Sequence, residues 1–447
     1  MKKESVLQNK NKSLKVSIKE GSASVFSNGI STSYITPFAL KLSSKEINIG
    51  FLSAFSGLIS PIAQLFSSKL MDNFSRKKIV RSAVLLQAIM WLPLALLAIL
   101  KYFDVWQNSL IYILIFGYSL IAALSGIAFP PWFSWMGDLV PEKERGKYFA
   151  KRNTILGIVE LIAVFLGALI LKSTENSTYA LIGFSIIFFL SFVTKLISFS
   201  ILKKQYSQYS AKVKKYEQSI TKIFKENKNF RTFSFYQFWL NFAIFFASPF
   251  FAVYMLNELK FDYLTYMLIS FSGALFYLLF NPLIGKFSDK YGNVRLFAIE
   301  NIFFALNPLL WILTGSPFWL FILPGIATGI ANSAAILSFN NFSYDYLTKK
   351  ERGTGIAYAN LFAGAGIFFG SIVGGLLLNY DISLFNLNKF IFIFILAFIL
   401  RLAVALIFLP KIKEQKKVKR IPHLHLSILH PFKSINSEIA WARHIFK

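Results

Sequence analysis

Residues 135–153 read WMGDLVPEKERGKYFAKRN and connect two long apolar runs. Asp138 stands at the end of the first run, and Arg145 and Gly146 follow seven residues later. The same spacing recurs at Asp345 and Arg352, which lie 207 residues further along the chain. A charged turn that is used twice, each time between apolar runs, predicts two homologous halves in parallel orientation.

The composition excludes a soluble globular protein. Only 15% of the 447 residues are charged and 55% are hydrophobic, whereas a soluble domain carries about 25% charged residues. Cys is absent, which excludes disulfides, thiolate metal sites and a Cys nucleophile. A net charge of +27 in a soluble protein would indicate nucleic-acid binding. Here the basic residues lie between and beyond the apolar runs, so we expect membrane topology and no nucleic-acid partner.

The apolar runs are long enough to cross a bilayer, which requires roughly 20 residues per helix. The sequence predicts an all-α polytopic membrane protein with twelve transmembrane helices in two pseudo-symmetric six-helix halves. The predicted spans are 20–41, 46–68, 79–100, 107–137, 152–171, 177–202, 232–256, 262–285, 294–314, 317–343, 354–378 and 388–409. The first span is the most polar, so we expect it to face protein or water rather than lipid.

Basic residues predict the orientation of the chain. With the N-terminus inside, the inner loops and tails hold forty Lys and Arg, and the outer loops hold six. The positive-inside rule then places both termini in the cytoplasm of a multi-pass protein of the cell (plasma or inner) membrane. No cleavable signal peptide is visible, because the polar residues 1–19 contain no apolar core.

The spans and charge runs divide the chain into five predicted regions. They are a cytoplasmic N-terminal tail at 1–19, a six-helix half at 20–202, a basic linker at 203–231, a second six-helix half at 232–409 and a basic C-terminal tail at 410–447. Helical spacing of apolar residues in the linker is compatible with a surface-lying amphipathic helix, and a solvated basic linker is equally compatible.

A second motif also occurs in both halves. After the second span, Asp72 is followed by Ser75, Arg76 and Lys77, with Ser68 four residues before it. After the eighth span, the corresponding residues are Gly285, Asp289, Lys290 and Gly292. With residues 135–153, this motif resembles the major facilitator superfamily, whose signature here is Gly-x3-Asp-Arg-x-Gly-Arg-Arg/Lys. The first copy lacks both glycines and the first Arg. The resemblance covers about residues 20–410 and implies a transporter fold without specifying a cargo.

The resemblance also implies a cytoplasmic latch made of charged residues at the inner helix ends. A carboxylate there can pair with Arg and meet the positive end of a neighbouring helix. The alternative is that these charges only set topology and cap helices. The candidate latch residues are Asp72, Arg76, Arg145, Asp138, Asp289, Asp345 and Arg352.

Spans one, four, seven and ten line the cavity in the resembling family. The polar and aromatic candidates for cargo contact there are Asn28, Tyr34, Trp132, Trp135, Gln237, Asn241 and Asn332. None is charged, which favours a neutral, zwitterionic or amphiphilic solute. Each could instead make a hydrogen bond between helices.

Charged residues inside spans are the candidates for ion coupling. Glu160 in span five and Lys195 in span six both lie roughly 11–13 Å from the inner surface, so they could pair. Glu300 in span nine is the second candidate, and Arg401 lies one residue from the repeat-equivalent of Lys195. If Lys195 pairs with Glu160, the carboxylate is structural; if not, it could carry a proton.

These observations predict a secondary active transporter or facilitator, not an enzyme, that works by alternating access on a small solute. No phosphate-binding Gly-x4-Gly-Lys-Ser/Thr loop is present, and we expect no cofactor and no metal. All four His lie in the C-terminal tail without a carboxylate to complete a metal site. A non-transporting sensor or scaffold and a lipid translocator are the alternatives. We expect a monomer in the bilayer.

Overall fold

The structure is a computed structural model that describes residues 2–43, 45–141, 144–175, 180–207, 220–348, 351–379 and 388–412. Within these ranges the chain forms helices and contains no strand. The C-terminal tail with its four His, and linker residues 208–219, lie outside the described residues. The predicted all-α class is therefore confirmed.

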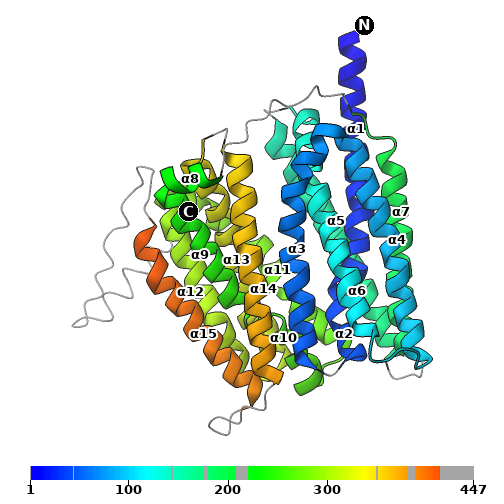
Figure 1. The fold of residues 1–447 in the computed structure, drawn as a ribbon, viewed down its shortest axis with the longest axis vertical. Coiled ribbons are helices and arrows are strands. Elements are labelled where there is room, and N and C mark those ends of the chain that lie inside the picture. Colours follow the sequence, from blue (N-terminus) through cyan, green and yellow to red (C-terminus); the bar gives the residue numbers. More distant parts are fainter. Residues whose placement is uncertain are drawn as a thin grey trace. The chain divides into compact units, whose positions relative to one another are not determined.

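The first half of the sequence forms seven α-helices (Figure 1). They are α1 (Lys2–Ser31), α2 (Ile35–Leu42), α3 (Glu46–Asn73), α4 (Arg76–Tyr102), α5 (Leu110–Leu139), α6 (Arg145–Thr174) and α7 (Ala180–Leu202), with a short 3-10 turn η1 (Thr32–Tyr34) after α1. The first predicted span is thus divided among α1, η1 and α2. Eleven helices in the described residues are long and apolar enough to cross a membrane, and α1 is not among them because its residues are too polar.

The second half forms the remaining helices (Figure 1). They are α8 (Ile220–Glu226), α9 (Lys228–Phe245), α10 (Phe250–Val253), the π-helical turn η3 (Tyr254–Glu258), α11 (Tyr263–Tyr291), α12 (Asn293–Ile312), α13 (Pro317–Tyr346), α14 (Arg352–Asn379), α15 (Lys389–Phe408) and the 3-10 turn η5 (Leu409–Lys411). The predicted spans two to six coincide with α3 to α7. The seventh coincides with the run from α9 to η3, and the last five coincide with α11 to α15.

The helices pack into two compact units that do not follow the sequence halves. Unit 1 comprises Met1–Tyr216, Gln237–Met267 and Ala357–Ile393, and unit 2 comprises Glu217–Tyr236, Leu268–Ile356 and Phe394–Lys447. Helices α9, α11, α14 and α15 each contribute residues to both units. Unit 1 therefore contains contacts between helices of the first and second halves of the sequence.

The polar face of α1 lies against α7 in unit 1. Ser27 Oγ donates to the Ser191 carbonyl at 3.1 Å, and Ser31 Oγ donates to Ser191 Oγ at 3.0 Å. All three serines are buried. This packing confirms the expectation that the polar first span faces protein, since each hydroxyl finds a partner on a neighbouring helix.

Glycines in α14 allow close backbone packing inside unit 1. A Cβ atom at Gly366, Gly370 or Gly374 would overlap with the carbonyl oxygen of Phe238, Phe242 or Phe246 respectively. The contacts advance by four residues along both segments. The glycine row of α14 therefore runs along α9 and the residue that follows it. This confirms the close approach that the Gly-x3-Gly-x3-Gly spacing predicts for span eleven.

The first half repeats this arrangement in α6 and α1. Gly167 lies 207 residues before Gly374 and packs against the Tyr34 ring, while Ala163 lies 207 residues before Gly370 and its Cβ is near Gly29. Equivalent helices of the two halves thus make equivalent contacts, with small residues at equivalent positions. The internal repeat in the sequence corresponds to a repeat in the packing.

The two copies of the second motif form their turns differently. In the first copy, Ser75 caps α4 by accepting a hydrogen bond from the Lys78 amide at 3.3 Å. In the second, Gly292 precedes α12 with a φ of 90°, a backbone conformation that favours glycine. The side-chain cap at Ser75 therefore replaces the family glycine that this sequence lacks.

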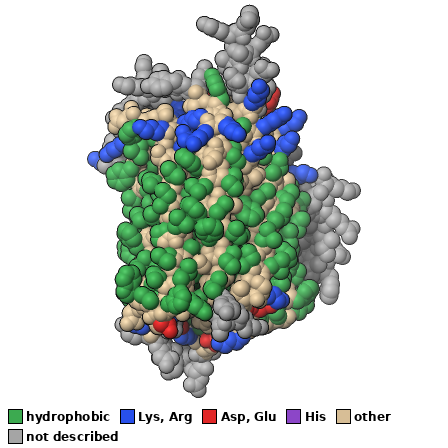
Figure 2. All heavy atoms as spheres, turned by 90° about the vertical axis from the view of Figure 1, so that its right-hand side faces the viewer, with side chains coloured by type: hydrophobic (Ala, Val, Ile, Leu, Met, Phe, Trp, Pro, Cys, Tyr) green, Lys and Arg blue, Asp and Glu red, His purple; other side chains and the backbone are tan. Residues whose placement is uncertain are grey.

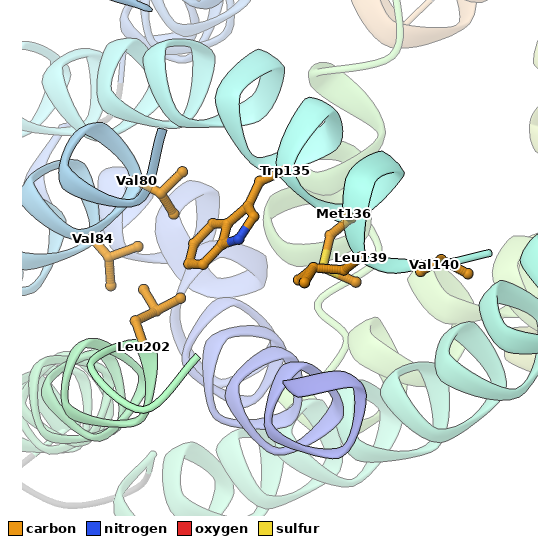
Figure 3. Packing of buried hydrophobic residues seen from close by; sticks show 7 residues of the cluster. All are labelled: Val80, Val84, Trp135, Met136, Leu139, Val140 and Leu202. Carbon is orange, nitrogen blue, oxygen red and sulfur yellow. The ribbon is translucent and has the colours of Figure 1, made fainter. Parts of the chain in front are cut away.

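An apolar cluster lies at the start of α4 and the ends of α5 and α7 in unit 1. Figure 3 shows the Trp135 indole among Val80, Val84 and Leu202, with Met136, Leu139 and Val140 next to it. On the face shown in Figure 2, Lys and Arg gather at one end of a broad apolar band, and Asp and Glu appear mainly at the other. We call the end of unit 1 that holds the start of α4 and the end of α7, with Lys77, Lys203 and Lys204, the basic end.

Candidate functional site

A buried charged network lies between α1, α6 and α7 in unit 1. Glu20 and Lys195 are only 5% and 4% exposed, and Arg152 is also buried. Ser198 Oγ donates to the Glu20 carboxylate at 2.8 Å, and Lys195 Nζ donates to Ser24 Oγ at 2.9 Å. The carboxylate also has favourable Coulomb interactions with Arg152 and Lys195. One acid and two bases thus share an interior polar site.

The sequence analysis did not select Glu20, because it is the first residue of a predicted span. A signal was available: Glu20, Ser24, Ser27 and Ser31 recur every three or four residues, and Ser191, Lys195 and Ser198 do the same on the sixth span. Two polar stripes at helical spacing indicate two helices that hydrogen-bond to each other.

The structure does not bring Lys195 to Glu160. The Lys195 ammonium points to α1, where it bonds Ser24. Glu160 is half-buried on α6, and among the described residues no hydrogen bond or ion pair to its carboxylate is found. Equal depth made the pair conceivable, but α1 lies closer to Lys195 than the Glu160 side chain does. The possible Glu160–Lys195 pair is therefore absent.

A second buried carboxylate lies in unit 2. Glu300 on α12 is 1% exposed. It accepts hydrogen bonds from the Tyr236 hydroxyl at 3.1 Å and the Ser338 hydroxyl at 2.9 Å. Asn301 Nδ2 donates to the same Tyr236 oxygen at 2.6 Å. Three helices, α9, α12 and α13, therefore meet at one carboxyl group whose hydrogen-bond donors are uncharged hydroxyls.

Arg401 is also buried in unit 2, on α15. Its Nη1 donates to the Phe304 carbonyl of α12 at 2.8 Å. The sequence placed this Arg at nearly the repeat position of Lys195. Both cations bind a neighbouring helix through hydrogen bonds instead of extending to the membrane surface.

The candidate cargo residues occupy different environments. The Tyr34 hydroxyl donates to the Val164 carbonyl, and Trp135 Nε1 donates to the Tyr206 carbonyl at 3.0 Å. Both side chains are fully enclosed by protein, so their polar groups serve helix packing. At these two positions the side chain bonds another segment of the chain, which is the alternative to cargo contact that the sequence left open.

The other candidates have less enclosed or locally bonded side chains. Asn28 is exposed, Trp132 and Asn332 are half-buried, and the Arg152 guanidinium lies over the Trp132 ring at 4.7 Å. Asn241 Nδ2 donates to the Gln237 carbonyl at 2.8 Å, one turn earlier on α9. Gln237 and Asn241 thus form a local amide pair.

One latch candidate pair is formed. Arg76 at the start of α4 makes an ion pair with Asp138 at the end of α5. Asp72 is exposed at the end of α3. The side chains of the other candidates are outside the described set: Arg145, Asp289, Asp345 and Arg352.

Two ion pairs at the opposite end link the two halves of the sequence within unit 1. Lys172 Nζ lies 3.2 Å from the Asp262 carboxylate, and Lys389 Nζ lies 2.6 Å from the Glu46 carboxylate. They join the end of α6 to the start of α11, and the start of α15 to the start of α3. The sequence analysis selected none of these four residues, because their pairing depends on chain segments 90 and 343 residues apart.

The first of these pairs is part of a small charged group. Partial burial raises the pKa of Asp262, but hydrogen bonds from Thr265 and Lys172 outweigh it, so its pKa lies below the ordinary value. Burial and the nearby Asp262 raise the pKa of Glu175. The two carboxyl groups are therefore separated in acidity, and Asp262, beside Lys172, loses its proton at a lower pH than Glu175 does.

Comparison with known proteins agrees with this architecture. The family model described as Major Facilitator Superfamily matches residues 21–255 and 233–443. The two matches together span nearly all of the chain. The chain belongs to the Major Facilitator Superfamily. It is therefore a multi-pass membrane protein of a superfamily of transporters, as the repeated charged motifs predict.

Solved transporters of this superfamily share the fold. A crystal structure of the nucleoside transporter NupG is 15% identical, with a TM-score of 0.68 over 91% of this chain and 100% of that chain. A D-xylose-proton symporter is 15% identical, with a TM-score of 0.67 over 91% and 99%. A POT family peptide transporter is 13% identical, with a TM-score of 0.67 over 93% and 100%. No curated protein matches the sequence.

Proposed function

We propose that this superfamily member moves a small neutral, zwitterionic or amphiphilic solute across the membrane by rocker-switch alternating access. The observation that carries the proposal is the linkage at the end opposite the basic end, where Lys172–Asp262 and Glu46–Lys389 join the sequence halves. Partly exposed ion pairs are each worth only about 0–1 kcal/mol, so they can break and re-form during a transport cycle.

The solute class follows from which residues remain available to a cargo. Asn28, Trp132, Asn241 and Asn332 have exposed or half-buried side chains and offer amides and an indole, with no charge among them, whereas Gln237 is buried. The buried charges Glu20, Lys195 and Arg152 are engaged with one another between helices. Nucleosides, a sugar and peptides are named for the structurally similar transporters, and these are neutral or zwitterionic.

The absence of Cys allows a direct test in proteoliposomes. Uptake of nucleosides, monosaccharides and dipeptides is measured for the wild type, and then for Lys172→Cys/Asp262→Cys treated with a short reversible thiol cross-linker. Saturable uptake of one class is expected, with uptake lost on cross-linking and restored on reduction. Each single-Cys variant is the control. Uptake that survives complete cross-linking would exclude opening between residues 172 and 262. If no solute of the panel is taken up, the proposed solute class is contradicted.

Both termini are proposed to be cytoplasmic, with the basic end inside. Asn73→Cys at the basic end and Ser173→Cys at the opposite end are both exposed positions, so each can react with a maleimide. In intact cells, a membrane-impermeant maleimide is expected to label Ser173→Cys and to leave Asn73→Cys unlabelled until the membrane is permeabilised. Labelling of Asn73→Cys alone in intact cells would reverse the topology.

The Arg76–Asp138 pair is proposed to be part of a cytoplasmic latch, together with the remaining latch candidates. If the two charges act through each other, Arg76→Gln and Asp138→Asn are each expected to lower the transport rate, and the double variant is expected to lose no more than the worse single variant. Transport rates of folded protein in proteoliposomes measure this. Losses that multiply in the double variant would mean that the two residues act independently.

Of the two candidate coupling carboxylates, Glu300 and Glu160, Glu300 is the one proposed here, because two hydroxyls bond its carboxyl group. Tyr236 and Ser338 can each donate to an ionised carboxylate or accept from a protonated one, so the site accommodates both states. Glu300→Gln is expected to abolish proton-driven accumulation while solute exchange continues. Glu160→Gln, in the same assay, is expected to change accumulation less than twofold. Loss of accumulation in Glu160→Gln but not in Glu300→Gln would assign proton coupling to Glu160.

A further inference from the structure

The segment that leaves α7 is held in place on three other helices of unit 1. Lys77 Nζ of α4 donates to the carbonyls of Lys203 and Gln205, at 2.9 Å and 2.7 Å. The Tyr206 amide donates to Ser13 Oγ of α1 at 3.1 Å, and the Tyr206 carbonyl accepts from Trp135 of α5. Residues 203–206 are therefore fixed by their backbone, while the Lys203 and Lys204 side chains remain exposed.

These side chains line a pocket at the basic end. Its volume is about 470 Å³, and Lys12, Lys77, Lys203 and Lys204 contribute to its wall together with Ser13 and Ser207. No Asp or Glu is among the lining residues. Four Lys from α1, α4 and the segment after α7 thus border one space, and the Lys77 ammonium also bonds the Lys203 and Gln205 carbonyls there. Its volume is within the range of small-ligand sites.

The four ammonium groups lack acidic partners. In the described part of the chain none of them forms an ion pair with a carboxylate, and Lys203 only approaches the Phe199 ring at 5.5 Å. Like charges gathered around a cavity repel one another and raise the local positive potential. An anion in the pocket relieves this repulsion.

We propose that this pocket binds a phosphate-bearing anion. Lys is a point-charge donor that suits phosphate oxygens, and the charge of the four Lys exceeds the one or two negative charges of a phosphate ester. Ser13 Oγ already accepts from the Tyr206 amide, so its own hydrogen is free to donate to a phosphate oxygen. The pocket lies at the ends of α4 and α7, at the level where phospholipid headgroups meet a membrane protein. A lipid headgroup and a soluble phosphate ester share this chemistry.

Binding here would have a defined mechanical effect. The ligand would bridge the N-terminal part of α1, the start of α4 and the segment after α7, three elements of unit 1 that meet at the basic end. The site is separate from the residues proposed for cargo contact and for coupling. Its occupancy therefore does not depend on transport activity.

Calorimetric titration of the purified full chain in detergent tests the proposal. The probes are a short-chain phosphatidylglycerol, glycerol 1-phosphate and a short-chain phosphatidylcholine. Lys12→Gln/Lys203→Gln/Lys204→Gln removes three pocket charges from exposed side chains, so the fold is retained. The matched control is Lys222→Gln/Lys225→Gln/Lys228→Gln, which removes three exposed charges around α8.

The wild type and the α8 control are expected to bind an anionic probe with the same affinity, and the pocket variant roughly tenfold or more weakly. Phosphatidylcholine is expected to bind poorly to all three proteins. Binding of phosphatidylglycerol alone would identify a membrane lipid as the ligand, whereas equal binding of glycerol 1-phosphate would identify a soluble ester. Equal affinities for the pocket variant and the control, or no anion binding by the wild type, would overturn the proposal.

Discussion

Gly374→Leu is expected to destabilise unit 1 more than any other single substitution considered for this chain. A side chain at Gly374 meets the Phe246 carbonyl oxygen and, at 2.9 Å, the Phe250 ring. Phe246 directly follows α9, and its backbone carbonyl cannot rotate away, so α14 must move away from α9 along the Gly366–Gly374 row. Overpacking typically costs about 1–3 kcal/mol, and a whole leucine side chain against a backbone oxygen is expected to exceed this range. The measurement is the temperature at which purified protein loses its monodisperse elution peak.

Gly374→Ala and Gly157→Leu make this result specific. Gly374→Ala adds only the Cβ atom, so a smaller fall in midpoint temperature is expected if the leucine variant does not accumulate. Gly157 is in α6, and a Cβ atom there meets nothing within 4 Å. Gly157→Leu is expected not to lower the midpoint, because the added side chain has open space and Leu is a better helix former than Gly. A Gly374→Ala midpoint equal to that of the wild type would show that α14 does not need the close approach.

Glu20→Gln is expected to have the second largest effect. The substitution keeps an oxygen that can accept from Ser198 but removes the only carboxylate with which Lys195 and Arg152 interact in this network. Two buried cations would then lack the carboxylate that compensates their charge. Breaking a buried charged group by removing one partner typically costs about 3–5 kcal/mol. The expected result is a large fall in the thermal midpoint of the purified protein.

Adding Lys195→Met to Glu20→Gln distinguishes the loss of charge compensation from the loss of side-chain packing. Glu20→Gln/Lys195→Met removes one carboxylate and one ammonium, so the double variant is expected to be more stable than Glu20→Gln alone. Glu160→Gln is the matched control, since Glu160 is a half-buried carboxylate in the same unit to which no ion pair is assigned. If the double variant is less stable than Glu20→Gln, the Lys195 ammonium contributes through its bond to Ser24, and the charge balance with Glu20 is unimportant.

The sequence by itself predicted the positions of most of the long apolar helices, the internal repeat and the packing row of α14. These features depend on local chemistry: a long apolar run must cross the bilayer as a helix, because unpaired backbone groups are too costly in lipid. The spacing of Gly366, Gly370 and Gly374 determined which face of α14 could approach a neighbour. The polarity of the first span likewise predicted that it would face protein.

Only the tertiary structure decided which side chains meet. Depth in the membrane gives one coordinate along a helix, and it made Glu160 and Lys195 look like partners. The rotation of each helix about its axis, and the identity of its neighbour, come from packing over the whole unit, and these turn Lys195 toward Ser24 and Glu20 on α1. The same reason explains why Lys172 and Asp262 could not be paired in advance. Their contact exists only because the end of α6 and the residue before α11, which are far apart in sequence, come together in the fold.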